Sequence, residues 1–326
     1  MDAPLLEILG LDVEFTTPRG TVRAVRGVSL EVRRGECLAI VGESGSGKSQ
    51  LLLGCLGLLA PSGRARGAVR FDGRDLLGPD PAPRREALGV RITMVAQDPM
   101  NALTPHLTIG RQLGEVVLER GLLAADAAHA RSLEALRSVR MPDPAARLRQ
   151  YPHELSGGQR QRAAIAMALM TGPDLLLADE PTTALDVTVQ AQVLGVLREA
   201  RDRGLALVLV SHDLGVVAGV ADHVAVMYAG RVVESAPARE LFAAPAHPYT
   251  AALLASVPRL DTPFSARLAG IEGQPPRAGE AGAGCAFAVR CPAASAQCRT
   301  EDPRLRAAGA RSVACHAPLV RLEGPS

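Results

Sequence analysis

One short segment constrains the fold of this chain more than any other: Gly42-Glu-Ser-Gly-Ser-Gly-Lys48-Ser49, which fits the pattern G-x-x-x-x-G-K-S/T. The wholly apolar run Cys37 to Val41 precedes it, as in a strand buried on both faces, and a helical stretch from Lys48 to Leu58 follows. Strand, glycine-rich loop and helix in this order form the context that the pattern requires. This context disfavours the alternative, a glycine-rich turn that binds nothing. The segment therefore predicts a phosphate-binding loop in an α/β domain.

The chemistry of such a loop assigns roles to its residues. Glycines let the backbone wrap closely around a phosphate, and N–H groups at a helix N-terminus attract the anion. We expect Lys48 to reach the β and γ phosphates and the Ser49 hydroxyl to ligate Mg²⁺. Lys48 is the only lysine among 36 lysines and arginines, which indicates that its position needs a compact ammonium group. The nucleotide-binding residues expected here are Gly42, Glu43, Ser44, Gly45, Ser46, Gly47, Lys48, Ser49 and Gln50.

A second apolar run, Leu175 to Ala178, ends in two acids, Asp179 and Glu180. Both carboxylates are expected at the C-terminal edge of a strand, where open α/β sheets bind their ligands. Asp179 is predicted to hold Mg²⁺, and Glu180 to orient or deprotonate an attacking water. The alternative, an acidic pair that only starts a loop or caps a helix, is weakened by the phosphate motif in the same chain.

The string Leu155-Ser-Gly-Gly-Gln159 decides between classes of phosphate-loop protein. Ser156 and Gln159 fit a capping box ahead of a helix, and the glycines Gly157 and Gly158 leave backbone N–H groups accessible to an anion. The alternative is an ordinary capped helix with a flexible glycine pair. With the two motifs above, the string resembles the signature of ABC ATPases, over about Leu5 to Ser256.

This resemblance implies a fold and an assembly. The fold is an α/β P-loop NTPase of ABC type, with a RecA-like core, an antiparallel β subdomain and a helical subdomain. The assembly is a head-to-tail dimer, in which ATP lies between Gly42 to Ser49 of one subunit and Ser156 to Gln159 of the other. ATP and Mg²⁺ are the implied cofactors.

Further positions resemble parts of the same family. Gln97 ends an apolar strand and is similar to the glutamine that senses Mg²⁺; the alternative is a polar residue at a strand end. Ala184-Leu185-Asp186 is similar to the loop that touches the opposite subunit, with Thr183 where many relatives have serine. His212 is similar to the switch histidine at the γ-phosphate, although a lone histidine at a strand end is usually structural. Phe15 is a candidate for stacking on adenine, against plain core packing.

Bulk properties exclude some classes of function. The chain has 326 residues and a formal net charge of +2, so nothing indicates nucleic-acid binding driven by charge. No run of about 18 apolar residues predicts a membrane span. The first residues lack the basic region of a secretory signal, so the sequence predicts a cytoplasmic protein. Six cysteines in a reducing compartment then favour free thiols or metal ligands over disulfides.

Periodicity predicts the order of elements. Strands are expected at Leu5 to Phe15, Thr21 to Val32, Ala68 to Phe71, Val90 to Ala96, Leu175 to Ala178, Ala206 to Val210, His223 to Tyr228 and Arg231 to Glu234, and helices at Thr108 to Arg120, Ala124 to Arg140 and Thr188 to Arg203. We expect an ATPase domain over residues 1–256, with a helical insert at about 98–165, and an extension over residues 257–326.

The extension carries the signal for a subfamily. His247-Pro-Tyr249-Thr, Gly270 to Pro276, and the cysteines that follow resemble the C-terminal region of ATP-binding subunits of dipeptide and oligopeptide importers. Two segments of the ATPase domain also resemble this group of importers: Gln97-Asp-Pro-Met-Asn-Ala-Leu-Thr-Pro105 and Tyr151-Pro-His-Glu154. The resemblance implies a peripheral protein at the cytoplasmic face of a bacterial membrane. Its implied partners are two membrane permeases, an extracellular binding protein and a second ATPase, in a heterodimer rather than a homodimer.

Two alternatives for function stay open at this point. The same motor serves nickel or other small solutes in some relatives. A soluble ABC ATPase outside transport is the alternative from another class, but such proteins usually carry two ATPase units or a long coiled-coil insertion.

Four cysteines of the extension, Cys285, Cys291, Cys298 and Cys315, are separated by five, six and sixteen residues. This spacing lacks the pairs typical of structural zinc and the common ferredoxin pattern, so spacing alone favours free thiols. The importer resemblance implies a possible 4Fe–4S cluster on these four residues, and His316 keeps zinc open. Cys37 and Cys55 lie in apolar stretches and are expected to be small buried hydrophobes.

Overall fold

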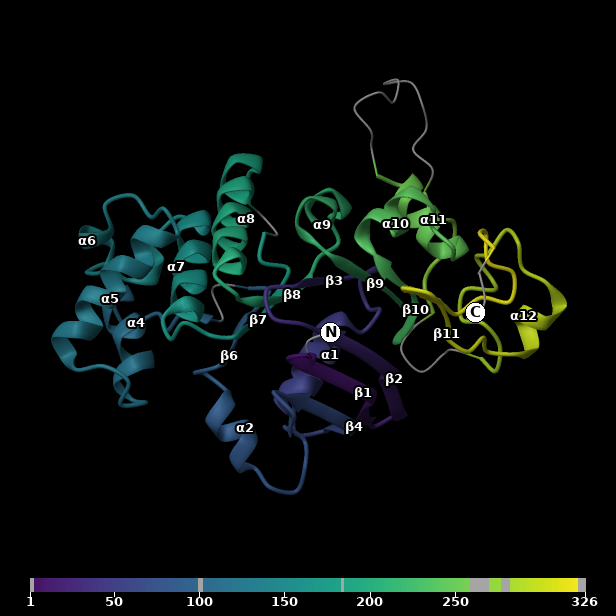
Figure 1. Cartoon of the computed structure of the whole chain (residues 1–326), viewed down its shortest axis with the longest axis horizontal. Coiled ribbons are helices and arrows are strands. Elements are labelled where there is room, and N and C mark those ends of the chain that lie inside the picture. The colour runs from purple at the N-terminus through teal and green to yellow at the C-terminus, as the bar shows by residue number, and fades with distance from the viewer. Residues whose placement is uncertain (1–2, 99–101, 183–184, 258–269, 277–281, 322–326) are drawn as a thin grey trace. The chain divides into compact units, whose positions relative to one another are not determined.

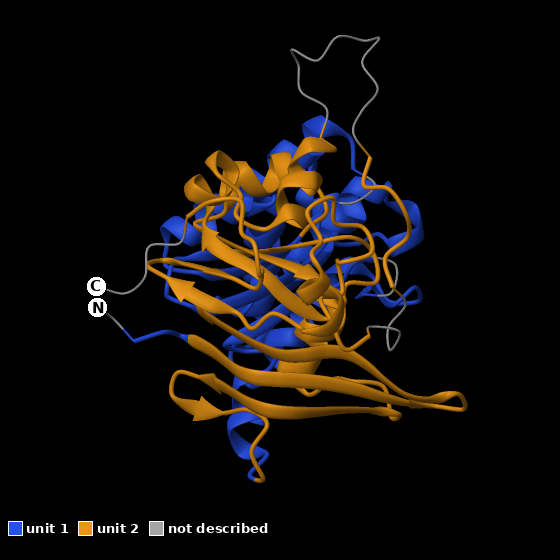
Figure 2. Ribbon diagram, turned by 90° about the vertical axis from the view of Figure 1, so that its right-hand side faces the viewer, with its two compact units in different colours: residues 1–5, 32–37, 80–210 blue, residues 6–31, 38–79, 211–326 orange. Residues whose placement is uncertain are grey.

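A computed structural model describes residues 3–98, 102–182, 185–257, 270–276 and 282–321. The chain divides into two compact units, each built from several segments of the sequence. Unit 1 comprises residues 1–5, 32–37 and 80–210, and unit 2 comprises residues 6–31, 38–79 and 211–326 (Figure 2). Within the described ranges, no helix has both the length and the apolar character needed to cross a bilayer.

Parallel strands form the centre of unit 1. Strand β7 (Leu175–Asp179) lies between β6 (Ile92–Val95) and β8 (Ala206–Val210), and both neighbours pair with it in parallel register. Every residue of β7 and β8 is buried, as their continuous apolar sequences predict. The bounds of β8 are those expected from the sequence, and helix α8 (Val187–Asp202) matches the expected covering helix within one residue at each end.

The helical insert of unit 1 consists of several helices that lie side by side (Figure 1). Helices α4 (Ile109–Leu118), α5 (Ala125–Ser138) and α7 (Gly157–Leu169) contact one another, and Leu113, Leu136 and Ile165 are among their buried residues. The expected helices at Thr108 to Arg120 and Ala124 to Arg140 are confirmed with shorter ends. Other short helices of the unit are α2 (Ala82–Ala87), α6 (Pro144–Arg147) and the 3₁₀ turn η1 (Pro152–Glu154).

The described residues of unit 2 contain strands of two sheets. One has the strand order β2-β1-β4-β5, made of β1 (Leu6–Thr17), β2 (Gly20–Val32), β4 (Gly63–Phe71) and β5 (Arg74–Asp75). Helix α1 (Lys48–Leu56) packs against β1 and β4. This approach is close at Gly54, where an added Cβ would lie 2.6 Å from a methyl group of Val13.

The other sheet of unit 2 surrounds β3 (Cys37–Val41), which pairs in parallel with β9 (His223–Tyr228). Strand β10 (Arg231–Pro237) runs antiparallel to β9, and Ala229-Gly230 forms the turn between the two strands. Two strands near the end of the chain extend this sheet: β12 (Arg311–Val313) pairs with β10, and β11 (Arg306–Ala308) pairs with β12. The C-terminal extension therefore adds strands to the sheet whose β3 leads into the phosphate loop.

The extension also contributes to the apolar core of unit 2. Phe287 is buried among residues of β3, β9 and β10, together with Tyr228 and Tyr249. The rings of these three residues lie 4.6–5.4 Å apart, which is the distance range of favourable aromatic pairs. The helices around this core are α9 (Leu214–Val220), α10 (Ala238–Ala243) and α11 (Pro248–Ala255), and α12 (Ala296–Thr300) lies further along the extension.

Candidate nucleotide-binding site

The loop from Gly42 to Gly47 connects β3 to α1, and two of its glycines are required by space as well as by backbone angle. Gly42 has φ 152°, and an added Cβ would lie 2.2 Å from the carbonyl oxygen of Met227. Gly47 has φ 101°, and an added Cβ would lie 2.3 Å from the carbonyl oxygen of Ala24. Any side chain at these positions forces the backbone to move, because real Cβ atoms do not approach oxygen so closely. The loop is thus fixed against β9 and β2.

Lys48 opens α1 and turns back over this loop. Its ammonium group donates to the carbonyl oxygens of Gly42 at 2.7 Å and of Glu43 at 3.0 Å, and lies 3.5 Å from Ser46 Oγ. The side chain is only 6% exposed. Helix α1 begins without a side-chain cap, since its N-cap residue is Gly47. A compact cation and uncapped helix N–H groups therefore converge on one loop, which is the arrangement that binds phosphate groups.

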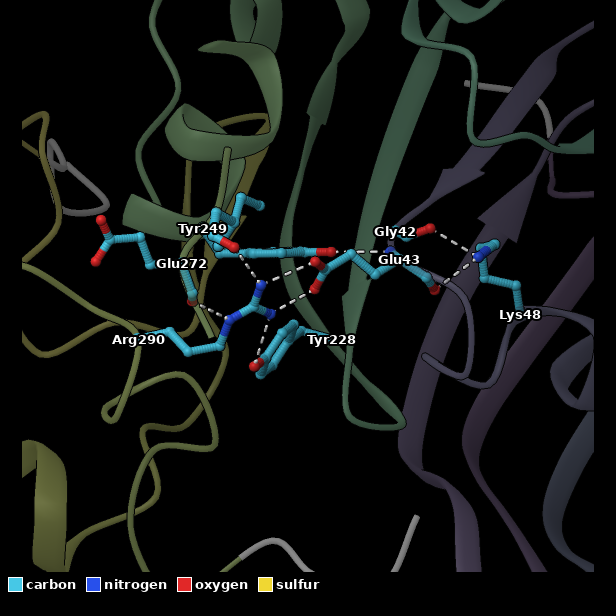
Figure 3. Close-up of polar contacts among 8 residues, drawn as sticks. Gly42, Glu43, Lys48, Tyr228, Tyr249, Glu272 and Arg290 are labelled. Atoms are coloured by element: carbon cyan, nitrogen blue, oxygen red, sulfur yellow. Dashed lines mark hydrogen bonds and ion pairs between the residues drawn. The ribbon is translucent and has the colours of Figure 1, made fainter. Parts of the chain in front are cut away.

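Glu43, the second residue of the loop, is held by side chains from far along the sequence (Figure 3). Its backbone N–H donates to the hydroxyl of Tyr249 at 2.9 Å. Its carboxylate forms a two-pronged ion pair with Arg290, with distances of 2.6 and 2.9 Å. Sequence reasoning missed both contacts, and no local pattern could have revealed them, because 206 and 247 residues separate the partners.

The acidic strand end lies in unit 1. Asp179 is the last residue of β7 and is 4% exposed. Glu180 follows with φ 49°, a left-handed conformation that costs a non-glycine residue roughly 1 kcal/mol or more. Its N–H donates to the carbonyl oxygen of Val210 at 2.9 Å, which helps to fix this conformation. The amide nitrogen of Gln97 donates to Glu180 Oε2 at 3.3 Å, so the structure brings together two of the predicted catalytic residues.

The signature segment starts α7, and its capping box is confirmed. The Gln159 N–H donates to Ser156 Oγ at 3.3 Å, and the Ser156 N–H donates to Gln159 Oε1 at 3.1 Å. A Cβ added to Gly158 would lie 3.2 Å from Val189, whereas one added to Gly157 would meet no described atom within 4 Å. The described part of the chain therefore gives no steric reason for glycine at position 157.

The remaining predicted residues lie at the ends of elements. Asp186 is the N-cap of α8 and accepts from the Val189 N–H at 2.9 Å. His212 is exposed and follows Ser211, whose N–H donates to the Ile40 carbonyl oxygen at 3.2 Å. Phe15 is half-buried on β1 opposite Gly63. Thr183 and Ala184 lie outside the described residues.

The four cysteines of the extension line one small pocket, together with His247, Phe287 and His316. Burial raises the pKa of the Cys285, Cys291 and Cys315 thiols, whereas hydrogen bonds from Ser295 lower the pKa of Cys298. Within the described ranges, no three His, Cys, Asp or Glu side chains are already arranged as a set of metal ligands. Cys37 and Cys55 are buried, which confirms the expectation for these two residues.

The class of P-loop NTPases is defined by a strand, a glycine-rich loop with a lysine, and a helix, in this order. This chain has all three, its lysine is buried, and it also carries an acidic strand end. Comparison with known proteins makes this class more specific. A profile of the family described as "ABC transporter" matches residues 25–183. A second profile, described as "Oligopeptide/dipeptide transporter, C-terminal region", matches residues 233–298.

Named relatives and solved structures agree with these profiles. The oligopeptide transport ATP-binding protein OppD of Salmonella typhimurium is 47% identical, over 98% of this chain and 95% of its own length. The dipeptide transport ATP-binding protein DppD of Bacillus subtilis is 50% identical, over 88% of this chain and 87% of its own length. The ATP-binding cassette MJ0796, in a dimeric post-hydrolysis state with ADP and Pi, superposes with a TM-score of 0.64 at 28% identity, covering 72% of this chain and 99% of that one. The chain therefore belongs to the ABC transporter family, as one of its ATP-binding and ATP-hydrolysing subunits.

Proposed function

We propose that the chain energises a bacterial importer of dipeptides or oligopeptides. The observation that carries this proposal is the match of residues 233–298 to the C-terminal region of such transporters. That region is part of the same compact unit as the phosphate loop, since it supplies β10, Tyr249, Phe287 and Arg290. The relatives from Salmonella and Bacillus that carry oligopeptide and dipeptide transport in their names support the same solute class.

The nucleotide chemistry follows from the residues described above. Lys48 contacts the phosphates of ATP, with the backbone of Gly42 to Ser49 around them, and Phe15 stacks on the adenine.

Glu180 orients the attacking water and accepts its proton, while Gln97 fixes the carboxylate through its hydrogen bond. His212 contacts the γ-phosphate, and Gln50 completes the start of α1. In this proposal ATP binding replaces the intraloop contacts of the Lys48 ammonium by contacts with phosphate oxygens.

The residues offered to a cation fit Mg²⁺. Ser49, Asp179 and Gln97 supply a hydroxyl, a carboxylate and an amide oxygen, and a hard divalent cation prefers oxygen ligands. Mg²⁺ bound by these groups neutralises charge on the phosphates. The motif residues thus supply the type of ligand that Mg²⁺ requires.

A second subunit completes each site in this proposal. Ser156, Gly157, Gly158 and Gln159 of one subunit cover the ATP held by the phosphate loop of the other, and Asp186 lies in the loop at that interface. The open space around Gly157 supports this arrangement, because glycine at an exposed helix start is explained by close approach of something outside the described chain. The second subunit is a related ATPase rather than a copy of this chain.

The division of the chain follows the same scheme. We assign the ATPase domain to residues 1–256, its helical insert to about residues 98–165, and the importer-type extension to residues 257–326. ATP-driven closure moves the helical inserts, which contact the cytoplasmic loops of two permeases, and an extracellular binding protein delivers the solute. The chain then acts as a peripheral protein at the cytoplasmic face of the membrane.

Purification of the tagged chain from its native membranes tests this function. We expect two polytopic membrane proteins and a second ABC ATPase to copurify, as identified by mass spectrometry. A matched preparation with a tagged, unrelated membrane-associated protein sets the background. Recovery of ribosomal or DNA-repair proteins without any permease would overturn the transport assignment and leave the ATPase assignment intact.

The cysteine pocket is assigned to a 4Fe–4S cluster within the same proposal. Thiolates are the usual ligands of such clusters and all four cysteines line one pocket, so the donor type fits, but the side chains must move to form a set of ligands. A cluster bound there would tie together a segment of the extension that has few large apolar residues. Iron and acid-labile sulfide, measured on anaerobically purified protein, are expected near four each per chain. Zinc without sulfide would instead support a site that includes His316, and the absence of both metals would leave free thiols.

A further inference from the structure

Arg290 of the extension is enclosed more tightly than an ordinary surface arginine. Its side chain is 4% exposed and makes five hydrogen bonds. Two go to the carboxylate oxygens of Glu43, two to the carbonyl oxygens of Ile271 and Glu272, and one to the Tyr228 hydroxyl (Figure 3). The guanidinium group also lies 5.9 Å from the centre of the Tyr228 ring. The hydrogen bonds to Glu43 raise the pKa of Arg290 further above its ordinary value.

These contacts fix one residue of the phosphate loop from three sides. The carboxylate of Glu43 binds Arg290, its N–H donates to Tyr249, and its carbonyl oxygen accepts from Lys48. Tyr249 is itself buried against Phe287 and Tyr228, so its hydroxyl has little freedom to move. The loop backbone next to the lysine is thus set by side chains that come after residue 227.

Charge and geometry indicate that Arg290 positions Glu43, rather than forming an ordinary stabilising ion pair at the surface. The Arg290 side chain is 4% exposed and that of Glu43 is 25% exposed, and such a partly buried ion pair adds little net stability, because desolvation offsets the attraction between the charges. Such a pair does fix the relative orientation of the two side chains, since the guanidinium fork matches a carboxylate only in a narrow range of orientations. Glu43 comes directly after Gly42, whose carbonyl oxygen contacts Lys48, so a change in its orientation moves the lysine's surroundings.

We propose that Arg290 is a positioning residue of the nucleotide site, which acts through Glu43 to hold the phosphate loop in the shape that accepts ATP, with Tyr249 as its backbone support. The inference rests on the proposed role of Gly42 to Ser49 in binding ATP. It gives the extension a part in nucleotide binding. An ABC ATPase domain that lacks this extension must support its loop by other means.

The test compares ATP dissociation constants and steady-state kinetics of variants in the purified complex. Arg290→Met and Glu43→Gln are each expected to raise the Kd for ATP about tenfold, the effect of losing one hydrogen-bonded charge contact. The KM for ATP should rise in parallel, while kcat at saturating ATP changes much less. The double variant should be no weaker than either single variant, because both remove the same contact. Arg290→Lys is expected to fall between wild type and Arg290→Met, since an ammonium group cannot form the two-pronged pair.

Two controls separate this inference from the proposed function. Arg304→Met removes an exposed arginine of the same extension and should leave the Kd unchanged. Lys48→Ala should abolish ATP binding, and unchanged binding there would refute the proposed site itself. If Lys48→Ala loses ATP while Arg290→Met and Glu43→Gln bind it within twofold of wild type, the positioning role is wrong and the site stands. If Arg290→Met does not fold, Glu43→Gln and Arg290→Lys decide the matter by the same criterion, and additive losses in the double variant also overturn the inference.

Discussion

At the scale of single residues, the conformation of Glu180 is the observation most closely tied to the proposed catalytic role. A left-handed backbone at a non-glycine residue is costly, and it persists where surrounding contacts fix it. Here the contacts are the Glu180 N–H bond to Val210 and the Gln97 bond to the carboxylate. Glu180 directly follows β7 and is partly exposed, which fits a group that must meet a water molecule.

Glu180→Gln tests the assignment of the general base. The amide keeps the size of the side chain but cannot accept the proton, so ATP binding should remain while turnover falls by about 10²–10⁴-fold. Binding is measured with a fluorescent ATP analogue and turnover by phosphate release. Glu199→Gln is the matched control, since Glu199 is half-exposed and pairs with Arg140, and it should leave both quantities unchanged. Full turnover in Glu180→Gln would assign the base elsewhere.

Cys55 gives a prediction for the pH dependence of stability. Burial in α1 raises the pKa of its thiol from 9.0 to about 12. The unfolded chain therefore releases this proton first as the pH rises, and stability is lost between pH 9 and about 12. By pH 10 the loss from this one group should be about 1.4 kcal/mol relative to pH 8, and Cys55→Ala should lack that part of the slope. Urea unfolding of both proteins at the two pH values measures it, and parallel slopes would contradict the assignment.

At the scale of elements, the sequence predicts what local patterning controls. The bounds of β3, β8 and β9 are those expected, because β3 and β8 are apolar runs followed by Gly42 and Ser211, and β9 ends at the turn Ala229-Gly230. The capping box of Ser156 and Gln159 was likewise predictable, since both partners lie within one turn. The short helices α9 to α12 and the strands β11 and β12 were missed, because long-range contacts rather than periodicity stabilise them. Arg290 was missed as a site residue for the same reason.

Strand β12 illustrates such a contact. It pairs with β10, and its Arg311 donates to the carbonyl oxygens of Ala244 and Glu240. The same guanidinium lies 3.6 Å from the carboxylate of Glu234, which is fully buried and accepts the N–H groups of Ala246 and His247. A buried carboxylate needs such a cation, so β12 contributes to stability through Arg311 as well as through its strand pairing.

Arg311→Met is expected to destabilise unit 2 by about 3 kcal/mol, because it leaves the buried Glu234 carboxylate without its cation. The methionine retains the apolar stem, so the loss reports the charge. Arg306→Met, an exposed change on the neighbouring β11, should cost less than about 0.5 kcal/mol. The free energy of unfolding in urea measures both, and equal effects of the two substitutions would show that the buried pair contributes nothing.

At the scale of the whole molecule, the two proposed anion-binding segments of the chain belong to different units. The phosphate loop with Lys48 belongs to unit 2, and the signature helix start with Ser156 belongs to unit 1. Membership of the ABC family and the dimeric post-hydrolysis structure of MJ0796 agree with sites that are shared between protomers. The uncrowded Gly157 is the feature of this chain that the sharing explains best.

The most direct test of the shared site places a photo-crosslinking residue at position 157 of the Glu180→Gln variant, in the complex purified with its second ATPase. With ATP and Mg²⁺, illumination should join position 157 to the phosphate loop of another ATPase protomer, giving a denatured product heavier than the 34.0 kDa chain. The same residue placed at the exposed position Leu122 of the helical insert serves as the control and should give no such product. A position-157 link that forms equally without ATP, or only within the same chain, would contradict the account.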